Sequence, residues 1–275
     1  MIISEENLKL TEIQKKLIVS GWGDEIYENT IVKKIFYDSD GLLIQGYSAF
    51  PVDFAGKLPV IIWNRGGNRK DGIIDDFLAK GIFGELASWG YAVLASNYRE
   101  NDEFGGKDVN DVLNLITLAE SISGCDSERI GMEGWSRGGM MTYKVLSLIS
   151  KIRCAVIISG LADLFRSEEN RSGLSGVYYK LFGSECEDEF ILRKKERSAV
   201  YFFDKISKDT HILLIHGTKD EKISFQDSSD MYEKLISSGI DCELKLIEDG
   251  DHYLKKNRKE TSQLRRSWFE RFLKT

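Results

Sequence analysis

The sequence contains little cysteine and little histidine. Four cysteines occur in 275 residues, widely spaced and without a Cys-x-x-Cys pair, so nothing indicates a disulfide framework. Cys154 and Cys242 lie in apolar, strand-like runs, where buried free thiols are expected. A reducing cytoplasm is the expected compartment. The only three histidines, His211, His216 and His252, show no metal-ligand spacing, so we expect no metal and no other cofactor.

Long apolar runs are also absent. No segment approaches the length that spans a bilayer, and the charged stretch from Met1 to Lys16 predicts no signal peptide. The formal net charge is −6 at pH 7, which argues against nucleic acid or an anionic membrane as a partner. No internal repeat and no Pro/Gly/Ser-rich linker is present, so residues 1–275 are expected to form a single domain.

What is present is a succession of short apolar, β-branched runs separated by helical patterns, which predicts an α/β fold with a mostly parallel central sheet flanked by helices. Two early runs flank Asp38-Ser39-Asp40-Gly41 and predict an N-terminal antiparallel hairpin, whose edge strands near residues 31–50 could serve a homodimer. The predicted strands are Ile31–Tyr37, Leu42–Phe50, Val60–Trp63, Tyr91–Ser96, Ile130–Glu133, Ala155–Ser159, Ile212–Ile215 and Cys242–Ile247.

Helical periodicity is clearest in four of the gaps between these runs. The predicted helices are Asp108–Ser121, Met140–Ser150, Gln226–Ser238 and Arg258–Leu273. The segment from about residue 161 to 203 is rich in Ser, Glu, Arg and aromatic residues and fits the strand–helix rhythm poorly. Two interpretations stay open: a mobile cap over the active-site face, or an ordinary set of connecting helices.

One motif indicates the chemistry. Gly134-Trp135-Ser136-Arg137-Gly138 has the G-x-S-x-G pattern of a nucleophile elbow, and it falls between a predicted strand and a predicted helix. The turn at such an elbow is so sharp that only small residues fit two positions either side of the serine. The helix that follows offers unpaired N–H groups to a developing oxyanion.

A serine needs a base, and the base needs an acid to orient it. In α/β-hydrolases these follow in the order Ser, Asp or Glu, then His, which favours His252, directly after the last predicted strand. His216 is expected near the site or against the core, and His211 at the surface. Asp220 is the favoured acid, with Glu221 and Asp163 as alternatives.

Oxyanion donors in this geometry are backbone N–H groups, one from the residue after the nucleophile and one from the loop after the third strand. Here these are Arg137 and the loop Asn64-Arg65-Gly66-Gly67-Asn68, in which paired glycines let the backbone approach an acyl carbonyl closely.

Four blocks of the chain resemble the catalytic domain of the prolyl oligopeptidase family of serine peptidases, in its acylaminoacyl-peptidase and dipeptidyl-peptidase-like branch. They resemble, in the family's order, its oxyanion loop, its Asn-Tyr-Arg…Lys-Asp-Val block, its nucleophile motif, and its acid and base segments. The blocks are Asn64-Arg65-Gly66-Gly67, Ser96-Asn97-Tyr98-Arg99 with Lys107-Asp108-Val109, Gly134–Gly139, and Leu214–Asp220 with His252. The resemblance implies an α/β-hydrolase fold, a Ser136–Asp220–His252 triad, and oxyanion or substrate contacts around Arg65, Gly66, Gly67, Tyr98 and Arg137.

The chain departs from the family's pattern in three places. Arg65 replaces a Tyr or His, and Glu100 replaces a glycine. Fewer than about 60 residues precede the hydrolase region, too few for the family's N-terminal β-propeller. Arg65, Arg137 and Glu100 could bind a charged substrate group, although surface ion pairs are an equal interpretation for Arg137 and Glu100.

The sequence therefore predicts a serine hydrolase that cleaves a small ester or a short peptide through an acyl-enzyme. It favours peptide and ester substrates almost equally. A non-catalytic binding protein with the same fold is the alternative. A metal-dependent hydrolase is a third class, which the histidine spacing does not support.

Overall fold

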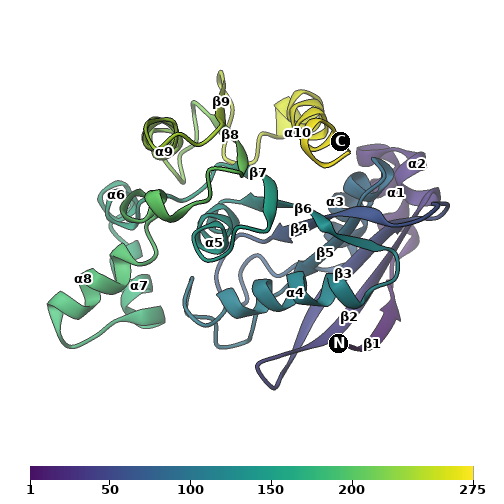
Figure 1. Ribbon diagram of the computed structural model, residues 1–275, viewed down its shortest axis with the longest axis horizontal. Helices are drawn as coiled ribbons and strands as arrows, with labels where there is room; N and C mark the ends of the chain where they lie inside the picture. The colour runs from purple at the N-terminus through teal and green to yellow at the C-terminus, as the bar shows by residue number, and fades with distance from the viewer. Residues whose placement is uncertain (275) are drawn as a thin grey trace.

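The computed structural model describes residues 1–274, which form one nine-stranded mixed sheet in the order β1-β2-β3-β5-β4-β6-β7-β8-β9 (Figure 1). The strands are β1 (Ile2–Asn7), β2 (Thr30–Ser39), β3 (Leu42–Pro51), β4 (Leu58–Asn64), β5 (Ala92–Ser96), β6 (Cys125–Trp135), β7 (Ile152–Ile158), β8 (His211–Gly217) and β9 (Cys242–Ile247).

Strand direction changes at β5. The pairs β1/β2, β2/β3 and β3/β5 are antiparallel, and every pair from β5 to β9 is parallel. The β2–β3 turn places Asp40 at φ 56° and Gly41 at φ 78°, the two consecutive positive φ angles of a tight hairpin. The predicted α/β fold with a mostly parallel sheet and an N-terminal antiparallel hairpin is confirmed.

The expected edge position of residues 31–50 is wrong. β1 pairs with the outer side of β2, and β3 pairs with β5, so both hairpin strands lie inside the sheet. β1 escaped prediction because its side chains are almost all exposed and show no apolar alternation. Among the described residues the free edges belong to β1 and β9.

Helices cover both faces of the sheet. α4, α5 and α9 pack on one face, whereas α3 and α10 pack on the other, with α1 and α2 against α3 (Figure 1). The helices are α1 (Glu12–Trp22), α2 (Asp24–Glu28), α3 (Asp76–Ser88), α4 (Val109–Ser121), α5 (Arg137–Leu146), α6 (Leu164–Asn170), α7 (Leu174–Phe182), α8 (Glu187–Lys195), α9 (Gln226–Ser237) and α10 (Arg258–Leu273).

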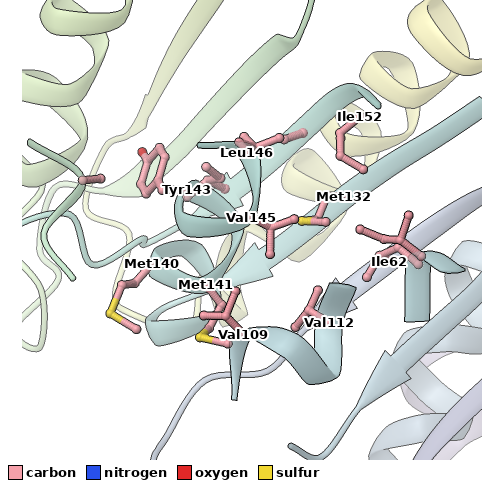
Figure 2. Packing of buried hydrophobic residues seen from close by; sticks show 14 of the residues in the cluster. Ile62, Val109, Val112, Met132, Met140, Met141, Tyr143, Val145, Leu146 and Ile152 are labelled. Carbon is pink, nitrogen blue, oxygen red and sulfur yellow. The ribbon is translucent and has the colours of Figure 1, made fainter. Parts of the chain in front are cut away.

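Alternate residues of the central strands enter the two cores. Along β4, Val60 and Ile62 belong to the cluster under α4 and α5, while Ile61 and Trp63 belong to the cluster under α3 and α10. Figure 2 shows the first cluster, where α4 and α5 side chains meet strand residues such as Met132. Burial on both faces explains why these strands read as continuous apolar runs.

Residues 161–203 form α6, α7 and α8, which lie to one side of the sheet beyond α5 (Figure 1). Their aromatic residues pack together and against the loop that precedes α4. The ring of Tyr178 lies 5.4 Å from Phe104 and 5.6 Å from Phe182, centroid to centroid. The segment is therefore anchored to the body of the protein by an aromatic stack.

Candidate active site

The G-x-S-x-G motif forms a sharp turn between β6 and α5. Ser136 adopts φ 59° and ψ −123°, a conformation that residues with a side chain rarely adopt. A Cβ on Gly134 would lie 2.2 Å from the carbonyl oxygen of Gly138, and one on Gly138 would lie 2.0 Å from that of Asn64. No methyl group fits at either position, so the predicted strand–turn–helix geometry of the elbow is confirmed.

Asp220 and His252 are brought together from the loops after β8 and β9. His252 Nδ1 lies 2.7 Å from Asp220 Oδ2, and the carboxylate is fully buried. The other carboxylate oxygen accepts hydrogen bonds from the backbone N–H groups of Lys222 and Ile223. Because Asp220 accepts the Nδ1 proton of neutral His252, the Nε2 atom is left as the basic nitrogen of the ring.

A second histidine contacts the same acid. His216, which is fully buried, places Nε2 3.2 Å from Asp220 Oδ2 and 3.1 Å from the carbonyl oxygen of Ile223. Burial alone would raise the pKa of Asp220, but the hydrogen bonds from His216 and His252 lower it far below its ordinary value. Asp220 is thus held as a carboxylate.

The alternative acids and the remaining histidine lie elsewhere. Asp163 caps the start of α6 by accepting a hydrogen bond from Phe165 N–H, and Glu221 is exposed. His211 stacks on Phe272 and bonds to Asp241.

The loop after β4 lies directly against the nucleophile. A Cβ on Gly66 would lie 3.1 Å from the carbonyl oxygen of Trp135 and 3.2 Å from Cβ of Ser136, so a side chain here would require the neighbouring atoms to shift by a few tenths of an ångström. Gly67 adopts φ +71°, which turns the loop away again. Arg137 is the first residue of α5, and its backbone N–H therefore has no acceptor within the helix.

The side chains of Arg65 and Arg137 are buried and do not lie on the surface of the protein. Arg137 is 2% exposed and forms ion pairs with Asp102 at 3.0 Å and Asp108 at 2.6 Å, so its interpretation as a surface ion pair is wrong. Its Nη1 also donates to the carbonyl of Gly67. Two buried carboxylates make this burial possible, because a guanidinium leaves water only when it is paired.

Arg65 and Tyr98 complete the same buried network. Arg65 is 1% exposed and donates to the carbonyl groups of Asn97, Gly66, Asp71 and Arg69. The ring of Tyr98 contacts both guanidinium groups, 4.8 Å from that of Arg65 and 5.1 Å from that of Arg137. These residues shape the loop and do not face the substrate space, whereas Glu100 is exposed and lies apart from Ser136.

Ser136 and His252 line one cavity of about 580 Å³. Sequence reasoning missed most of its wall, because residues far apart along the chain meet there. The wall includes Gly66, Phe104, Trp135, Leu161, Tyr178 and Tyr253. Five residues of the 161–203 segment line the cavity and place part of that segment beside the nucleophile: Leu161, Ser167, Arg171, Leu174 and Tyr178. Within residues 1–274 no group of three or more His, Cys, Asp or Glu side chains could hold a metal.

The sequence model of the prolyl oligopeptidase family matches residues 84–275. The chain belongs to this family. The match contains the nucleophile motif and the Asp220 and His252 segments, and it begins after the glycine loop at Asn64. The resemblance inferred from the four sequence blocks is therefore confirmed, and the chain is a serine hydrolase of the prolyl oligopeptidase type.

Several relatives are peptidases by name. The chain is 28% identical over 243 residues to the uncharacterized peptidase YtmA of Bacillus subtilis, covering 84% of this chain and 90% of YtmA. It is 26% identical over 158 residues to dipeptidyl peptidase 4 of Sus scrofa, covering 57% of this chain and 20% of that enzyme. Against the peptidase YuxL of Bacillus subtilis the match covers 85% of this chain and 38% of the relative.

Solved structures of the family share the fold. The acylaminoacyl peptidase of Pyrococcus horikoshii superposes with a TM-score of 0.76 at 22% identity, over 90% of this chain and 42% of that one. Dipeptidyl peptidase 4 of Porphyromonas gingivalis gives a TM-score of 0.74 at 19% identity, over 90% and 36%.

Proposed function

We propose that this prolyl oligopeptidase family member cleaves short peptides through an acyl-enzyme on Ser136, with His252 as the base and Asp220 as the acid. The observation that carries the proposal is the 2.7 Å contact between His252 Nδ1 and Asp220 Oδ2 beside a cavity that Ser136 also lines. A triad is recognised by such geometry and roles.

In this mechanism His252 Nε2 takes the proton of Ser136 as the hydroxyl attacks the substrate carbonyl carbon. The backbone N–H groups of Gly66 and Arg137 stabilise the oxyanion of the tetrahedral intermediate. His252 then protonates the leaving amine, and a water molecule activated by the same ring hydrolyses the acyl-enzyme. Asp220, held ionised by its donors, stabilises the imidazolium that forms at each step.

The substrate class rests on the relatives and on the cavity. YtmA and YuxL are named peptidases, and a cavity of about 580 Å³ has the size of a small-molecule site, which suits a short peptide or a small ester. We propose that esters are also cleaved, because attack on an ester needs the same groups and expels a better leaving group.

We further propose that residues 161–203 act as a cap within a single domain, since five of these residues line the cavity. The free thiols of Cys125, Cys154, Cys186 and Cys242 support a reducing, cytoplasmic location. Among residues 1–274 no helix has both the length and the apolarity to cross a membrane.

Labelling with a fluorophosphonate probe tests the nucleophile. We expect the folded protein to be labelled at Ser136 and the Ser136→Ala variant to remain unlabelled. Failure of the folded protein to react would favour the non-catalytic binding protein, and loss of activity with a chelator would favour a metal-dependent hydrolase. Turnover of aminoacyl p-nitroanilides and matched p-nitrophenyl esters then separates peptidase from esterase activity.

The acid is tested by a matched pair of substitutions. Asp220→Asn keeps the shape of the side chain but removes its charge, and it is expected to lower kcat by about 10⁴-fold. Glu221→Gln, one residue along the same turn, is expected to leave kcat within about twofold, because Glu221 is exposed. The reverse pattern would assign the acid to Glu221.

A further inference from the structure

A second cavity, of about 700 Å³, lies between the loop that precedes α4 and the helices α5, α7 and α8. Its lining carries five cationic side chains and two carboxylates, Glu103 and Glu196. The cations are Lys107, Lys144, Lys180, Arg193 and Arg197. We call this space the basic cavity. It shares none of its lining residues with the cavity of Ser136.

Arg197 is the most unusual of these cations. It is 7% exposed and forms no ion pair within residues 1–274. Its Nε donates to the carbonyl groups of Glu103 and Phe104, and its Nη1 donates to that of Arg193. Nη2 has no hydrogen-bond partner in the described part of the chain. Carbonyl groups hold this guanidinium in place, and the carboxylates of Asp108, Glu196 and Glu103 act on its charge from beyond ion-pair distance. A buried charge without a close counter-ion is unfavourable.

Lys144 of α5 repeats the pattern close to Arg197. Its Nζ donates to the carbonyl of Glu196 at 2.7 Å, and no carboxylate of the described residues pairs with it. Burial lowers the pKa of both Arg197 and Lys144. The carboxylates around them offset this only in part: Asp108, Glu196 and Glu103 act on Arg197, and Glu196 acts on Lys144. An anion that enters the cavity would bring a negative charge closer to both cations.

We propose that the basic cavity binds a small phosphate-bearing anion. Within residues 1–274 the Nη2 atom of Arg197 has no acceptor and can donate to a phosphate oxygen, and lysine ammonium groups at the rim add charge. The volume falls within the range of small-molecule sites. Tyr179 also lines the cavity and offers an aromatic surface to an organic part of the ligand, whereas the ring of Phe182 is already covered by Arg197 and Tyr178.

The site would communicate with the nucleophile through one short loop. Gly105 and Gly106 line the basic cavity, and their N–H groups donate to Asp108, which pairs with Arg137 next to Ser136. Phe104 of the same loop lines the cavity of Ser136. An anion bound here would tie α7 and α8 to this loop. Its effect on turnover rests on the proposed function, whereas its binding does not.

Binding is therefore measured on the Ser136→Ala protein, by isothermal calorimetry and thermal unfolding with inorganic phosphate, AMP and adenosine. Sodium chloride at equal ionic strength is the reference. We expect phosphate and AMP to bind and to raise the melting temperature above the sodium chloride value, and adenosine to do neither. Tighter binding of AMP than of phosphate would identify a phosphate ester as the ligand, and equal binding would identify phosphate alone as sufficient.

Two double variants locate the site. Lys107→Gln with Lys180→Gln removes two exposed rim charges and is expected to weaken phosphate binding about tenfold, or roughly 1.4 kcal/mol. The matched control, Lys256→Gln with Lys259→Gln, removes two exposed charges elsewhere and is expected to leave the affinity unchanged. Arg197→Gln is expected to abolish binding where it folds. Equal weakening in both double variants, or no binding beyond that in sodium chloride, would overturn the proposal.

Discussion

His216 Nε2 lies 3.2 Å from Asp220 Oδ2, the same oxygen that accepts the hydrogen bond of His252. Both groups that face His216 Nε2, this carboxylate and the carbonyl of Ile223, are acceptors, so the proton of the neutral ring belongs on Nε2. Nδ1 then accepts from the hydroxyl of Ser228 at 2.7 Å. His216 thus has one defined tautomer and acts as a positioning residue for the acid.

Replacing His216 tests this role. His216→Leu removes a hydrogen bond to a buried charge, worth about 1.5–3 kcal/mol, and should lower kcat by about tenfold or more. The freed carboxylate also stabilises protonated His252 more strongly, so the acid limb of the kcat/KM profile should move to higher pH. His216→Gln retains a donor and should recover most of both effects. A Leu variant with lower kcat and an unmoved acid limb would reduce His216 to a packing role.

Arg137 holds the glycine loop and two buried carboxylates at once, which a lysine cannot do. Arg137→Lys cannot keep the ion pairs with both Asp102 and Asp108, and of these two carboxylates only Asp102 has a second cationic partner, Arg65 at 3.6 Å. We expect the free energy of unfolding to fall by about 3–5 kcal/mol. Arg266→Lys, in an exposed pair with Glu270, should change it by less than about 0.5 kcal/mol. Denaturant unfolding of both variants measures the contrast. Equal losses of unfolding free energy in the two variants would mean that the buried ion pairs stabilise the fold no more than an exposed pair does.

Lys80 should give the fold a distinct alkaline pH dependence. Burial lowers the pKa of Lys80 from 10.5 to about 8, while its Nζ donates to the backbone carbonyl of Thr30. Between these two pH values the unfolded chain binds more protons than the folded one, so the Lys80 contribution to stability rises with pH. Below about pH 8 the charged side chain destabilises the fold by about 3 kcal/mol.

The variant Lys80→Met removes this titration. Relative to it, the original protein should gain up to about 3 kcal/mol in unfolding free energy as the pH rises from about 8 to about 10.5. The exposed Lys16→Met serves as the control and should show a constant difference. Denaturant titrations across this range decide the matter, and a pH-independent difference for Lys80→Met would contradict the assignment.

Two glycines in helices provide a matched test of the elbow. A Cβ at Gly138 would lie 2.0 Å from the carbonyl oxygen of Asn64, whereas one at Gly176 in α7 meets nothing within 4 Å. Gly138→Ala is therefore expected to destabilise the protein by several kcal/mol, about 3 or more, and to abolish probe labelling. Gly176→Ala should stabilise it by about 0.5–1 kcal/mol, because alanine favours a helix over glycine. Thermal unfolding compares the two variants. A Gly138→Ala variant as stable as the original protein would contradict the proposed geometry of the elbow.

The existence and order of the central strands could be predicted from the sequence, because burial on both sheet faces leaves continuous apolar runs. Their ends were less certain, since the predicted Ile130–Glu133 is the core of the longer β6, Cys125–Trp135. β9 and α10 begin and end where the pattern placed them. α3 gave no clear signal, because Gly81 and Gly84 interrupt it. A Cβ on Gly81 would lie 2.6 Å from the ring of Trp22, so these glycines let the N-terminal helices pack closely.

The chemical residues were predictable to the extent that a local motif names them. Ser136, Asp220 and His252 were selected by chain order and loop position, and their catalytic roles stay predictions. The burial of Arg137 could not be read in this way, since Asp102 and Asp108 lie 35 and 29 residues away along the chain. The sequence around the motif does not show that carboxylates distant along the chain pair with this arginine in the interior.

The backbone at Ser136 has a consequence for how the protein evolves. A serine at φ 59° and ψ −123° is held in a region that costs about 1–3 kcal/mol, and glycine would occupy it without that penalty. Mutational drift under selection for folding alone would therefore replace this serine with glycine. Retention of serine at this strained turn would therefore indicate selection for its hydroxyl group.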